Sequence, residues 1–564
     1  MRKLILFLCV INYFNLLSQE PVLVRQDYLG SGKYSKGTFR NLKAVGNTLF
    51  FVTDDGINGS ELFKSDGTEG GTVLVKDIYP GAGKSKSSNP EVLINFNNQL
   101  FFYAYTGGSD GEGLWKSDGT EAGTVKVKAL REGSGNPLYA SNLVIGNTMY
   151  FEGESLNNQY GLWKTDGTEA GTIMVKAFNR DTNAANNLSN FIEYKNKMYF
   201  SAFDSAKGSE LWVSDGTESG TVLLKDIMPG DNTSHSGIGG MTIVGEELLF
   251  AANDGTSGSE LWKTDGSASG TTMIKDIMPG ANSSNIGDLE NVNGVLFFRA
   301  DDSSANGSEL WKSDGTASGT VMIKDIRPGN IRFSTDSKPT DLRAIGNLVY
   351  FIANDGEHGT ELWKSDGTEA GTVMIKDIET ARYQGGASSN SLVVFNNQII
   401  FKGTDANGQE HWVSYGTEAG TKILKDTNGD NTIYAKYFDT NLYVGGGTIT
   451  DNGVFFFLSY DGVNGTEPGL WKFDQSALSV EKESLNHIKK VRVFPNPVSS
   501  ILNLKADNQQ IQSLRIYNLF GTEVMNVSNK NKIKNINISN FSTGIYMLQL
   551  KTDSGFFTKK FIKK

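Results

Sequence analysis

Glu61-Leu-Phe-Lys-Ser-Asp-Gly-Thr-Glu-Gly-Gly-Thr72 is the stretch that decides the fold, because close variants of it recur along the chain. All eight tryptophans of the 564-residue sequence stand in this phrase, and Phe63 takes their place in the first copy. Successive copies lie 48 to 59 residues apart, at Trp115, Trp163, Trp212, Trp262, Trp311, Trp363, Trp412 and Trp471. A period near fifty residues predicts a propeller or solenoid rather than a string of unrelated domains.

Each period contains four strand-like segments separated by turn residues. In one period these segments cover residues 222–227, 241–244, 247–252 and 260–263. Four short strands in a unit of about forty to fifty residues are typical of a propeller blade. Leu261 and Trp262 are both large and apolar although a strand directs them to opposite faces, so both faces of the sheet must be covered. We predict an all-β propeller of eight or nine four-stranded blades over residues 19–474.

The two ends of the repeat region indicate how such a ring closes. Val22-Leu-Val-Arg25 echoes Val73-Leu-Val-Lys76, whereas no strand of that type follows the last copy at Trp471. We expect the N-terminal strand to complete the final blade, which removes open sheet edges. The irregular stretch 428–450 leaves eight and nine blades as alternatives.

The recurring phrase resembles the ELWxxDGT repeat of secreted bacterial proteins. The resemblance covers residues 22 to about 474 and includes eight near-complete copies. It implies a secreted repeat protein and says little about activity.

The first residues have the three-part build of a secretory signal. Arg2 and Lys3 precede an interrupted apolar run that ends at Leu17, and Ser18 follows it. The run is too short to span a bilayer, so residues 1–18 are predicted to be a cleaved signal peptide. The single cysteine, Cys9, lies in this segment, so no disulfide or thiol chemistry is expected in the mature protein. No other stretch has membrane-spanning length, which predicts a soluble mature protein.

Composition changes after a polar linker at residues 475–490. Residues 491–564 contain short alternating segments such as Val493-Phe-Pro-Asn-Pro-Val498 and Leu514-Arg-Ile-Tyr-Asn-Leu-Phe-Gly521. Glycine and proline separate these segments, which is typical of a small Ig-like β-sandwich.

This C-terminal segment resembles the type A sorting domain of type IX secretion. The resemblance is carried by Pro495, Asn496, Pro497, Gly521, Gly544, Tyr546, Lys559 and Lys560. It implies export across both membranes, handling by the type IX secretion machinery, and removal of the domain by its processing enzyme. It also implies either release or attachment to the outer surface of the outer membrane.

Charge is distributed unevenly between the two predicted domains. The whole chain has a formal net charge of −10, whereas residues 485–564 carry +10 and residues 19–484 carry −22. An acidic body repels nucleic acid, which binds through basic patches. The contrast also suggests two modules with separate tasks.

Two recurring acidic elements have structural interpretations and weaker functional ones. Ser-Asp-Gly-Thr, as at 65–68, is best explained as a hairpin turn that every blade needs. The loop Asp254-Gly-Thr-Ser-Gly-Ser-Glu260, with equivalents at 55–61 and 355–361, offers two carboxylates per blade, and calcium is the ion that they suit. A hairpin role remains the main interpretation, and no cofactor is required.

Catalytic motifs are absent from the sequence. The four histidines (His235, His358, His411 and His487) lack zinc-site spacing, and no serine stands in a nucleophile elbow. His411 replaces a core leucine beside Trp412.

Residues that depart from the repeat are better candidates for ligand binding, because no blade needs them for its fold. They are Arg327, Arg332, Arg343, Arg382 and Tyr383, on loops that would hold an acidic or sugar ligand. Three function classes follow. The leading one is a secreted or surface binding, adhesion or scaffold module with a glycan among its ligands. The second is an enzyme acting on extracellular polysaccharide, a glycosidase or lyase, which would need a carboxylate pair that the sequence does not single out. The third is a purely structural surface element.

Overall fold

The computed structural model describes residues 21–25, 39–81, 86–107, 111–130, 141–179, 188–230, 233–302, 306–329, 335–378, 386–406, 408–424, 447–459, 469–474, 491–506, 511–518, 523–528, 533–552 and 555–564. The predicted signal peptide and linker lie outside these ranges. The chain divides into two compact units, and we call Ser18–Asp474 the repeat unit and Gln475–Lys564 the C-terminal unit. Every regular element in the described ranges is a β-strand, which confirms the all-β prediction.

Six sheets of the repeat unit are built from four consecutive antiparallel strands each. Their strands are β2 (Arg40–Val45), β3 (Thr48–Asp54), β4 (Ser60–Ser65), β5 (Val73–Lys76); β6 (Glu91–Phe96), β7 (Gln99–Tyr105), β8 (Glu112–Ser117), β9 (Val125–Ala129); β10 (Asn142–Ile145), β11 (Thr148–Glu154), β12 (Tyr160–Thr165), β13 (Ile173–Ala177); β14 (Leu188–Tyr194), β15 (Lys197–Asp204), β16 (Gly208–Ser214), β17 (Val222–Lys225); β18 (Gly239–Val244), β19 (Glu247–Asn253), β20 (Ser259–Thr264), β21 (Thr272–Lys275); β22 (Gly287–Val292), β23 (Val295–Asp301), β24 (Ser308–Ser313) and β25 (Val321–Lys324).

Two further sheets complete the described part of the repeat unit. A nine-stranded sheet contains two consecutive strand sets that are joined through β30, which pairs with both. A four-stranded sheet contains the N-terminal strand and the last three strands of the unit. The nine-stranded sheet comprises β26 (Thr340–Ile345), β27 (Leu348–Asn354), β28 (Thr360–Ser365), β29 (Val373–Lys376), β30 (Gly386–Ala387), β31 (Val393–Phe395), β32 (Gln398–Asp405), β33 (Gly408–Ser414) and β34 (Thr421–Ile423), and the other comprises β1 (Val22–Arg25), β35 (Gly447–Ile449), β36 (Val454–Ser459) and β37 (Gly469–Asp474).

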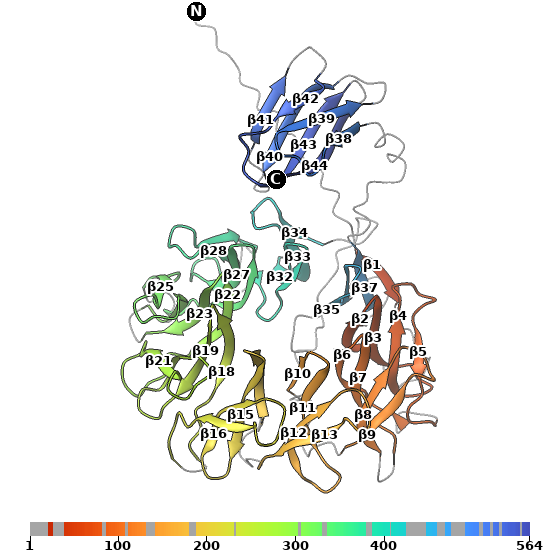
Figure 1. Cartoon of the computed structure of the whole chain (residues 1–564), viewed down its shortest axis with the longest axis vertical. Helices are drawn as coiled ribbons and strands as arrows, with labels where there is room; N and C mark the ends of the chain where they lie inside the picture. The colour runs from red at the N-terminus through yellow and green to blue at the C-terminus, as the bar shows by residue number, and fades with distance from the viewer. Residues whose placement is uncertain are drawn as a thin grey trace, which may run out of the picture. The chain divides into compact units, whose positions relative to one another are not determined.

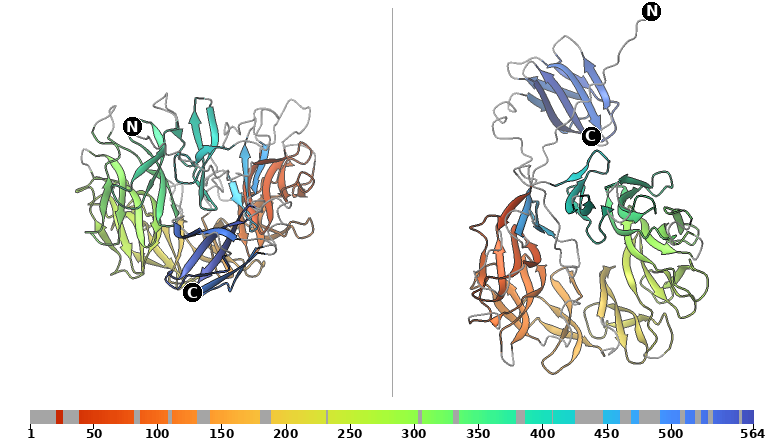
Figure 2. Two further views of the ribbon diagram at one scale, coloured as in Figure 1. Left: turned by 90° about the horizontal axis from the view of Figure 1, so that it is seen from above. Right: turned by 180° about the vertical axis from the view of Figure 1, so that it is seen from behind.

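The sheets follow one another around a common centre in chain order (Figures 1 and 2). The first strands of neighbouring sheets contact one another, as β18 does with β22 and β22 with β26. The first strand therefore lies innermost in each set. The fourth strand begins with an exposed valine or isoleucine in most sets, such as Val73 and Val222.

Apolar side chains fill the junction between one sheet and the next. In β20, Leu261 is fully buried and the neighbouring Trp262 is 7 % exposed, so both faces of this strand are covered as predicted. Trp262 packs against Leu211 and Ile227 of the preceding sheet. The interior of the repeat unit is thus a series of cores between sheets rather than one central core.

The N-terminal strand completes the last sheet. β1 pairs antiparallel with β37, with Val22 opposite Lys472 and Leu23 opposite Trp471. Val24 and Phe456 of this sheet share an apolar cluster with Phe51 of β3. The main-chain N–H of Asp451 also donates to the Gly46 carbonyl at 3.0 Å. The predicted closure by the N-terminal strand is confirmed.

The C-terminal unit has two sheets around one apolar core. Buried residues of this core include Leu502, Leu514, Ile516, Leu548 and Phe561. One sheet has the order β38-β39-β42 and the other β41-β40-β43-β44. The strands are β38 (Val491–Phe494), β39 (Ile501–Ala506), β40 (Ile511–Asn518), β41 (Glu523–Ser528), β42 (Asn535–Asn537), β43 (Gly544–Thr552) and β44 (Gly555–Lys563).

Candidate functional site

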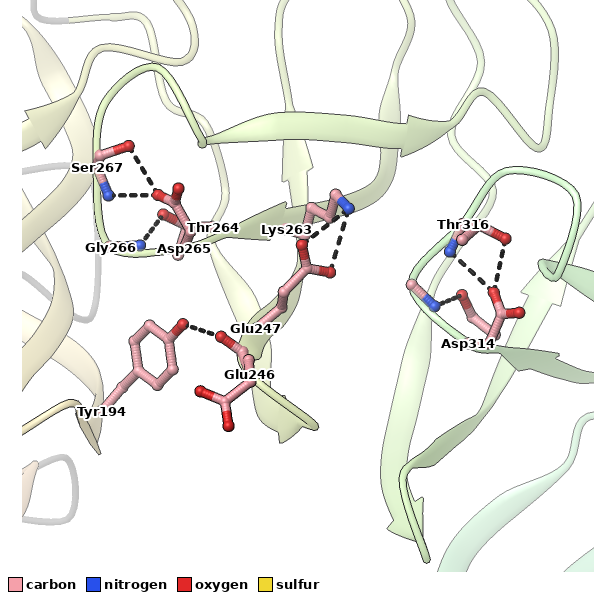
Figure 3. Close-up of polar contacts among 12 residues, drawn as sticks. Tyr194, Glu246, Glu247, Lys263, Thr264, Asp265, Gly266, Ser267, Asp314 and Thr316 are labelled. Atoms are coloured by element: carbon pink, nitrogen blue, oxygen red, sulfur yellow. Dashed lines mark hydrogen bonds and ion pairs between the residues drawn. The ribbon is translucent and has the colours of Figure 1, made fainter.

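The Ser-Asp-Gly-Thr turns are held by a repeated set of hydrogen bonds. In the turn after β24, the N–H and hydroxyl of Thr316 donate to Asp314 Oδ1 at 2.9 and 2.7 Å, and the Gly315 N–H donates to Ser313 Oγ at 3.1 Å. These bonds from Thr316 hold the pKa of the Asp314 carboxyl below its usual value. Figure 3 shows the equivalent turn at Asp265 beside this one. The aspartates therefore stabilise the turns, in agreement with the interpretation of Ser-Asp-Gly-Thr as a hairpin turn.

A lysine of the third strand ties most of these turns to the preceding sheet. Lys64 Nζ donates to the Gly119 carbonyl at 2.8 Å, and Lys312 Nζ donates to the Gly367 carbonyl at 2.9 Å. Lys263 is different, since its ammonium lies 2.9 Å from the Glu247 carboxylate (Figure 3). Most of the recurring third-strand lysines thus hold neighbouring sheets together.

The same kind of contact occurs where the ring closes. Lys76 Nζ of β5 donates to the Thr124 carbonyl of the next sheet at 2.9 Å. Arg25 of β1 donates to the Thr72 carbonyl at 2.7 Å, which is the equivalent contact one sheet earlier. Arg25 therefore takes the place of the repeated lysine, and it stands where the matching segment has Lys76.

The acidic loops considered for calcium use their carboxylates internally. Asp55 Oδ1 accepts the N–H groups of Ile57 and Asn58 at 2.9 and 2.7 Å. Glu61 accepts the N–H of Ile78 and of Ser88 at 3.0 and 2.7 Å. No group of three or more histidine, cysteine, aspartate or glutamate side chains suited to a metal ion occurs among the described residues.

A glutamate of the third strand is buried in six strand sets, although strands of this composition normally bury only apolar side chains. Glu61, Glu210, Glu260, Glu309, Glu361 and Glu410 are each 0 or 1 % exposed. Apart from a role in the calcium loop, the sequence pattern alone predicts no function for this glutamate. The signal was present, because a glutamate recurs directly before a Leu-Trp pair that must itself be buried.

Charges that break the repeat gather on the first strands of two neighbouring strand sets. Asp288 of β22 lies 2.9 Å from Arg299 of β23, and its other carboxylate oxygen accepts the Asp341 N–H at 2.9 Å. Arg343 of β26 lies 2.7 Å from Asp341 Oδ1. Glu290 accepts the N–H of the residue after Arg343 at 2.9 Å. These residues form a charged network that departs from the repeat.

The five predicted ligand-binding residues are therefore placed differently from one another. Arg343 belongs to this network and its side chain is 38 % exposed. Arg327 is only 9 % exposed and donates to the carbonyl of Asp336 and to Asn354 Oδ1, both at 3.4 Å. Arg332, Arg382 and Tyr383 lie outside the described residues.

The histidines have distinct surroundings. His411 is buried against Phe457, and burial lowers its pKa to about 3, so this side chain is neutral in the fold. His358 lies 2.6 Å from Asp355 in the loop before β28, and the hydrogen bond that His358 Nδ1 donates to the Asp355 carboxylate raises the pKa of His358. Neither arrangement resembles a nucleophile with its base.

Residues of the predicted sorting motif support the C-terminal unit. Asn496 Oδ1 accepts the Ile562 N–H at 2.8 Å, which fastens the Pro495–Pro497 segment to β44. The buried Tyr546 donates its hydroxyl to the Ser542 carbonyl at 2.9 Å. Gly544 begins β43 and Lys559 lies in β44. Lys560 also belongs to β44, while Gly521 lies outside the described residues.

Comparison with known families identifies this C-terminal unit. Residues 492–564 match the family described as the secretion system C-terminal sorting domain. The segment is thus a type IX secretion sorting domain, and the chain is a secreted or cell-surface protein. A comparison with curated proteins finds no match. No helix with the length and hydropathy of a membrane span occurs in the described ranges.

Several solved structures are similar to this chain at low identity. The computationally designed Ika8 protein is 15% identical, with a TM-score of 0.37, over 70% of this chain and 99% of its own. The β-propeller domain of the Trilobed protease from Pyrococcus furiosus is 10% identical, with a TM-score of 0.33. The similarity covers 70% of this chain and 99% of that domain. Puromycin hydrolase is 13% identical, with a TM-score of 0.33. The similarity covers 70% of this chain and 61% of the hydrolase. These values carry nothing about activity.

Proposed function

We propose that the repeat unit is a nine-bladed propeller that works outside the cell as a binding, adhesion or scaffold module, with extracellular glycans as its ligand class. Two observations support nine blades. Nine strand sets alternate with nine apolar clusters among the described residues, and the N-terminal strand lies in the last set. The two sheets and shared core of the C-terminal unit support an Ig-like sandwich.

The functional proposal is supported by a difference between the recurring polar residues and those that depart from the repeat. Recurring carboxylates and lysines are engaged in turns and in contacts between neighbouring sheets, as at Asp314 and Lys312. The charges that depart from the repeat instead gather around Asp341 and Arg343, where two neighbouring sets meet. Guanidinium and carboxylate groups held next to each other are suited to sugar hydroxyls and acidic sugars.

Arg343 is the best placed of the predicted ligand-binding residues, because its side chain is partly exposed within this network. Arg332, Arg382 and Tyr383 remain part of the proposed site. Arg327 has a supporting role through its contacts with Asp336 and Asn354. No cofactor is part of the proposal.

The sorting domain directs export, and we propose that a processing enzyme of the type IX machinery then removes it. The mature repeat unit is either released or attached to the outer surface of the outer membrane. Its acidic charge disfavours nucleic acid as a partner.

The experiment measures both binding and turnover by residues 19–474 on a panel of extracellular polysaccharides. Retention without soluble product is the expected result, and Arg343→Gln weakens it, whereas Lys422→Gln on the outer strand β34 does not. Release of soluble fragments would overturn the binding role and indicate a glycosidase or lyase. Absence of retention across the panel would reject glycans as the ligand class.

A further inference from the structure

The buried glutamates occupy the same position in their sheets, and four of them (Glu61, Glu210, Glu260 and Glu309) accept an N–H after the fourth strand and hydrogen-bond a serine of the segment that enters the next sheet. Glu309 of β24 accepts the Ile326 N–H at 2.9 Å and the Ser337 N–H at 3.1 Å. Glu61 of β4 accepts the corresponding N–H groups of Ile78 and Ser88. Each carboxyl group thereby connects the segment after the fourth strand with the segment that enters the next sheet.

The serine hydroxyls beside Glu210, Glu260 and Glu309 each have two candidate acceptors for one proton. Ser337 Oγ lies 2.6 Å from Glu309 Oε2 and 3.3 Å from the Ser308 carbonyl oxygen. A hydroxyl donates only one hydrogen bond. If Glu309 holds a proton, it donates to Ser337 Oγ, and the Ser337 hydroxyl then donates to the carbonyl. The protonated carboxyl group therefore satisfies both contacts, whereas a carboxylate satisfies one.

Ser284 and Ser236 repeat this arrangement in two other sheets. Ser284 Oγ lies 3.0 Å from the Ser259 carbonyl oxygen and also hydrogen-bonds Glu260. Ser236 Oγ lies 2.8 Å from the Ser209 carbonyl oxygen and also hydrogen-bonds Glu210. The geometry is thus a property of the repeat.

The charges around Glu309 do not offset its burial. The charged side chain that acts on it is Asp325, which is acidic and lies in the segment after β25. Arg327, two residues later, donates instead to the Asp336 carbonyl and to Asn354. On the segment that enters the next sheet, Asp336 pairs with Lys338. Acidic neighbours recur in the other sheets, since Asp77 acts on Glu61 and Asp276 on Glu260. Asp226 acts on Glu210 and is itself paired with Lys207 at 2.8 Å.

We propose that Glu210 and Glu309, together with Glu61 and Glu260 in the equivalent positions, are proton-binding sites that make the cohesion of the ring depend on pH. In the protonated state each one closes the hydrogen-bond chain between two connecting segments. Loss of the proton leaves a buried carboxylate beside an aspartate, which weakens the junction.

The direction of the pH dependence follows from burial. Burial raises the pKa of Glu309 to about 8 and that of Glu210 to about 7, and both lie above the ordinary value near 4.5. A glutamate with a raised pKa in the fold holds a proton that the unfolded chain has lost. Its stabilising contribution is fully present below about pH 4.5 and disappears as the pH rises through about 7 to 8.

The test follows the unfolding equilibrium of the full chain in denaturant at pH 5.5, 6.5, 7.5 and 8.5. The wild-type unfolding constant is expected to rise with pH. Each such glutamate contributes up to about a tenfold increase per pH unit between its unfolded and folded pKa. Glu309→Gln is expected to reduce this slope by up to one power of ten per pH unit near pH 6.5, while Glu369→Gln, in an exposed turn, leaves it unchanged. An unchanged slope in a folded Glu309→Gln variant would overturn the proposal.

If the glutamine variant does not fold, infrared spectroscopy of the wild-type chain tests whether the buried glutamates hold protons. A protonated carboxyl group has a carbonyl stretch distinct from that of a carboxylate. This band is expected at pH 6 in the folded protein and is lost reversibly by pH 9. Its absence at pH 6 would reject protonated glutamates in the fold.

Discussion

The recurring tryptophans permit a comparison within one molecule. Trp363 is 6 % exposed and its ring stacks on Phe351, but no acceptor among the described residues lies within hydrogen-bonding distance of its indole N–H. Trp471 is similarly buried, and its indole N–H donates to the Ser459 carbonyl at 3.0 Å. We compare Trp363→Phe with Trp471→Phe, because phenylalanine stands naturally at the equivalent Phe63.

The expected costs follow from these contacts. Exchange of tryptophan for phenylalanine removes roughly 40 Å² of buried apolar surface, which is about 1 kcal/mol. At Trp471 the variant also removes the hydrogen bond from the indole N–H to the Ser459 carbonyl, which adds about 0.5–1.5 kcal/mol. At Trp363 the variant removes an unpartnered buried N–H, so a gain of similar size offsets the lost area. We expect a cost of about 0–1 kcal/mol at Trp363 and about 1.5–2.5 kcal/mol at Trp471.

The assay is urea unfolding of both variants and the wild type, followed by far-ultraviolet circular dichroism, which does not depend on the tryptophan removed. Trp471→Phe should unfold at clearly lower urea than Trp363→Phe. Equal losses in the two variants, or a larger loss for Trp363→Phe, would refute the reasoning. That result would mean that the Trp363 indole forms a stabilising hydrogen bond.

Three other predictions concern single sites. Gly161→Ala places a Cβ 2.2 Å from the Lys176 carbonyl oxygen and should cost about 1–3 kcal/mol or more in urea unfolding. Lys364→Met removes the tie to the next turn and should cost about 1–2 kcal/mol, with exposure of that turn detected by hydrogen exchange. His358 has a raised pKa beside Asp355, so its contribution to stability is full below about pH 6.5 and is lost as the pH rises through the folded pKa. His358→Asn should remove this component from the pH dependence of the melting temperature; an unchanged profile would contradict it.

Periodic features of the fold were predictable from the sequence. The Asp-Gly turns and the Leu-Trp strands recur so often that their local chemistry fixes both the strand order and the covered faces. The pairing of β1 with β37 was predictable as well, because the segment at Val22 repeats the segment at Val73. These features depend on residues near one another in the sequence or on exact repetition.

The site was less predictable, because it depends on contacts across sheets. Arg327 stands in a long connecting segment and was expected at the surface, yet the fold buries it against Asn354. The contact between Asp288 and the Asp341 N–H joins residues fifty-three positions apart. No local sequence pattern predicts such a contact. The glutamates in the third strands were visible in six of the nine copies, but their partners come from two separate segments.

Closure of the repeat unit by its N-terminal strand is the claim on which the rigid binding module depends. Val22→Cys combined with Lys472→Cys tests it directly, since these residues are paired across β1 and β37 and the only native cysteine is Cys9, in the predicted signal peptide. Mass spectrometry without reductant should find one intramolecular disulfide, and Val22→Cys with Lys364→Cys should give none. Failure of the first pair to cross-link within one chain would contradict the closed ring.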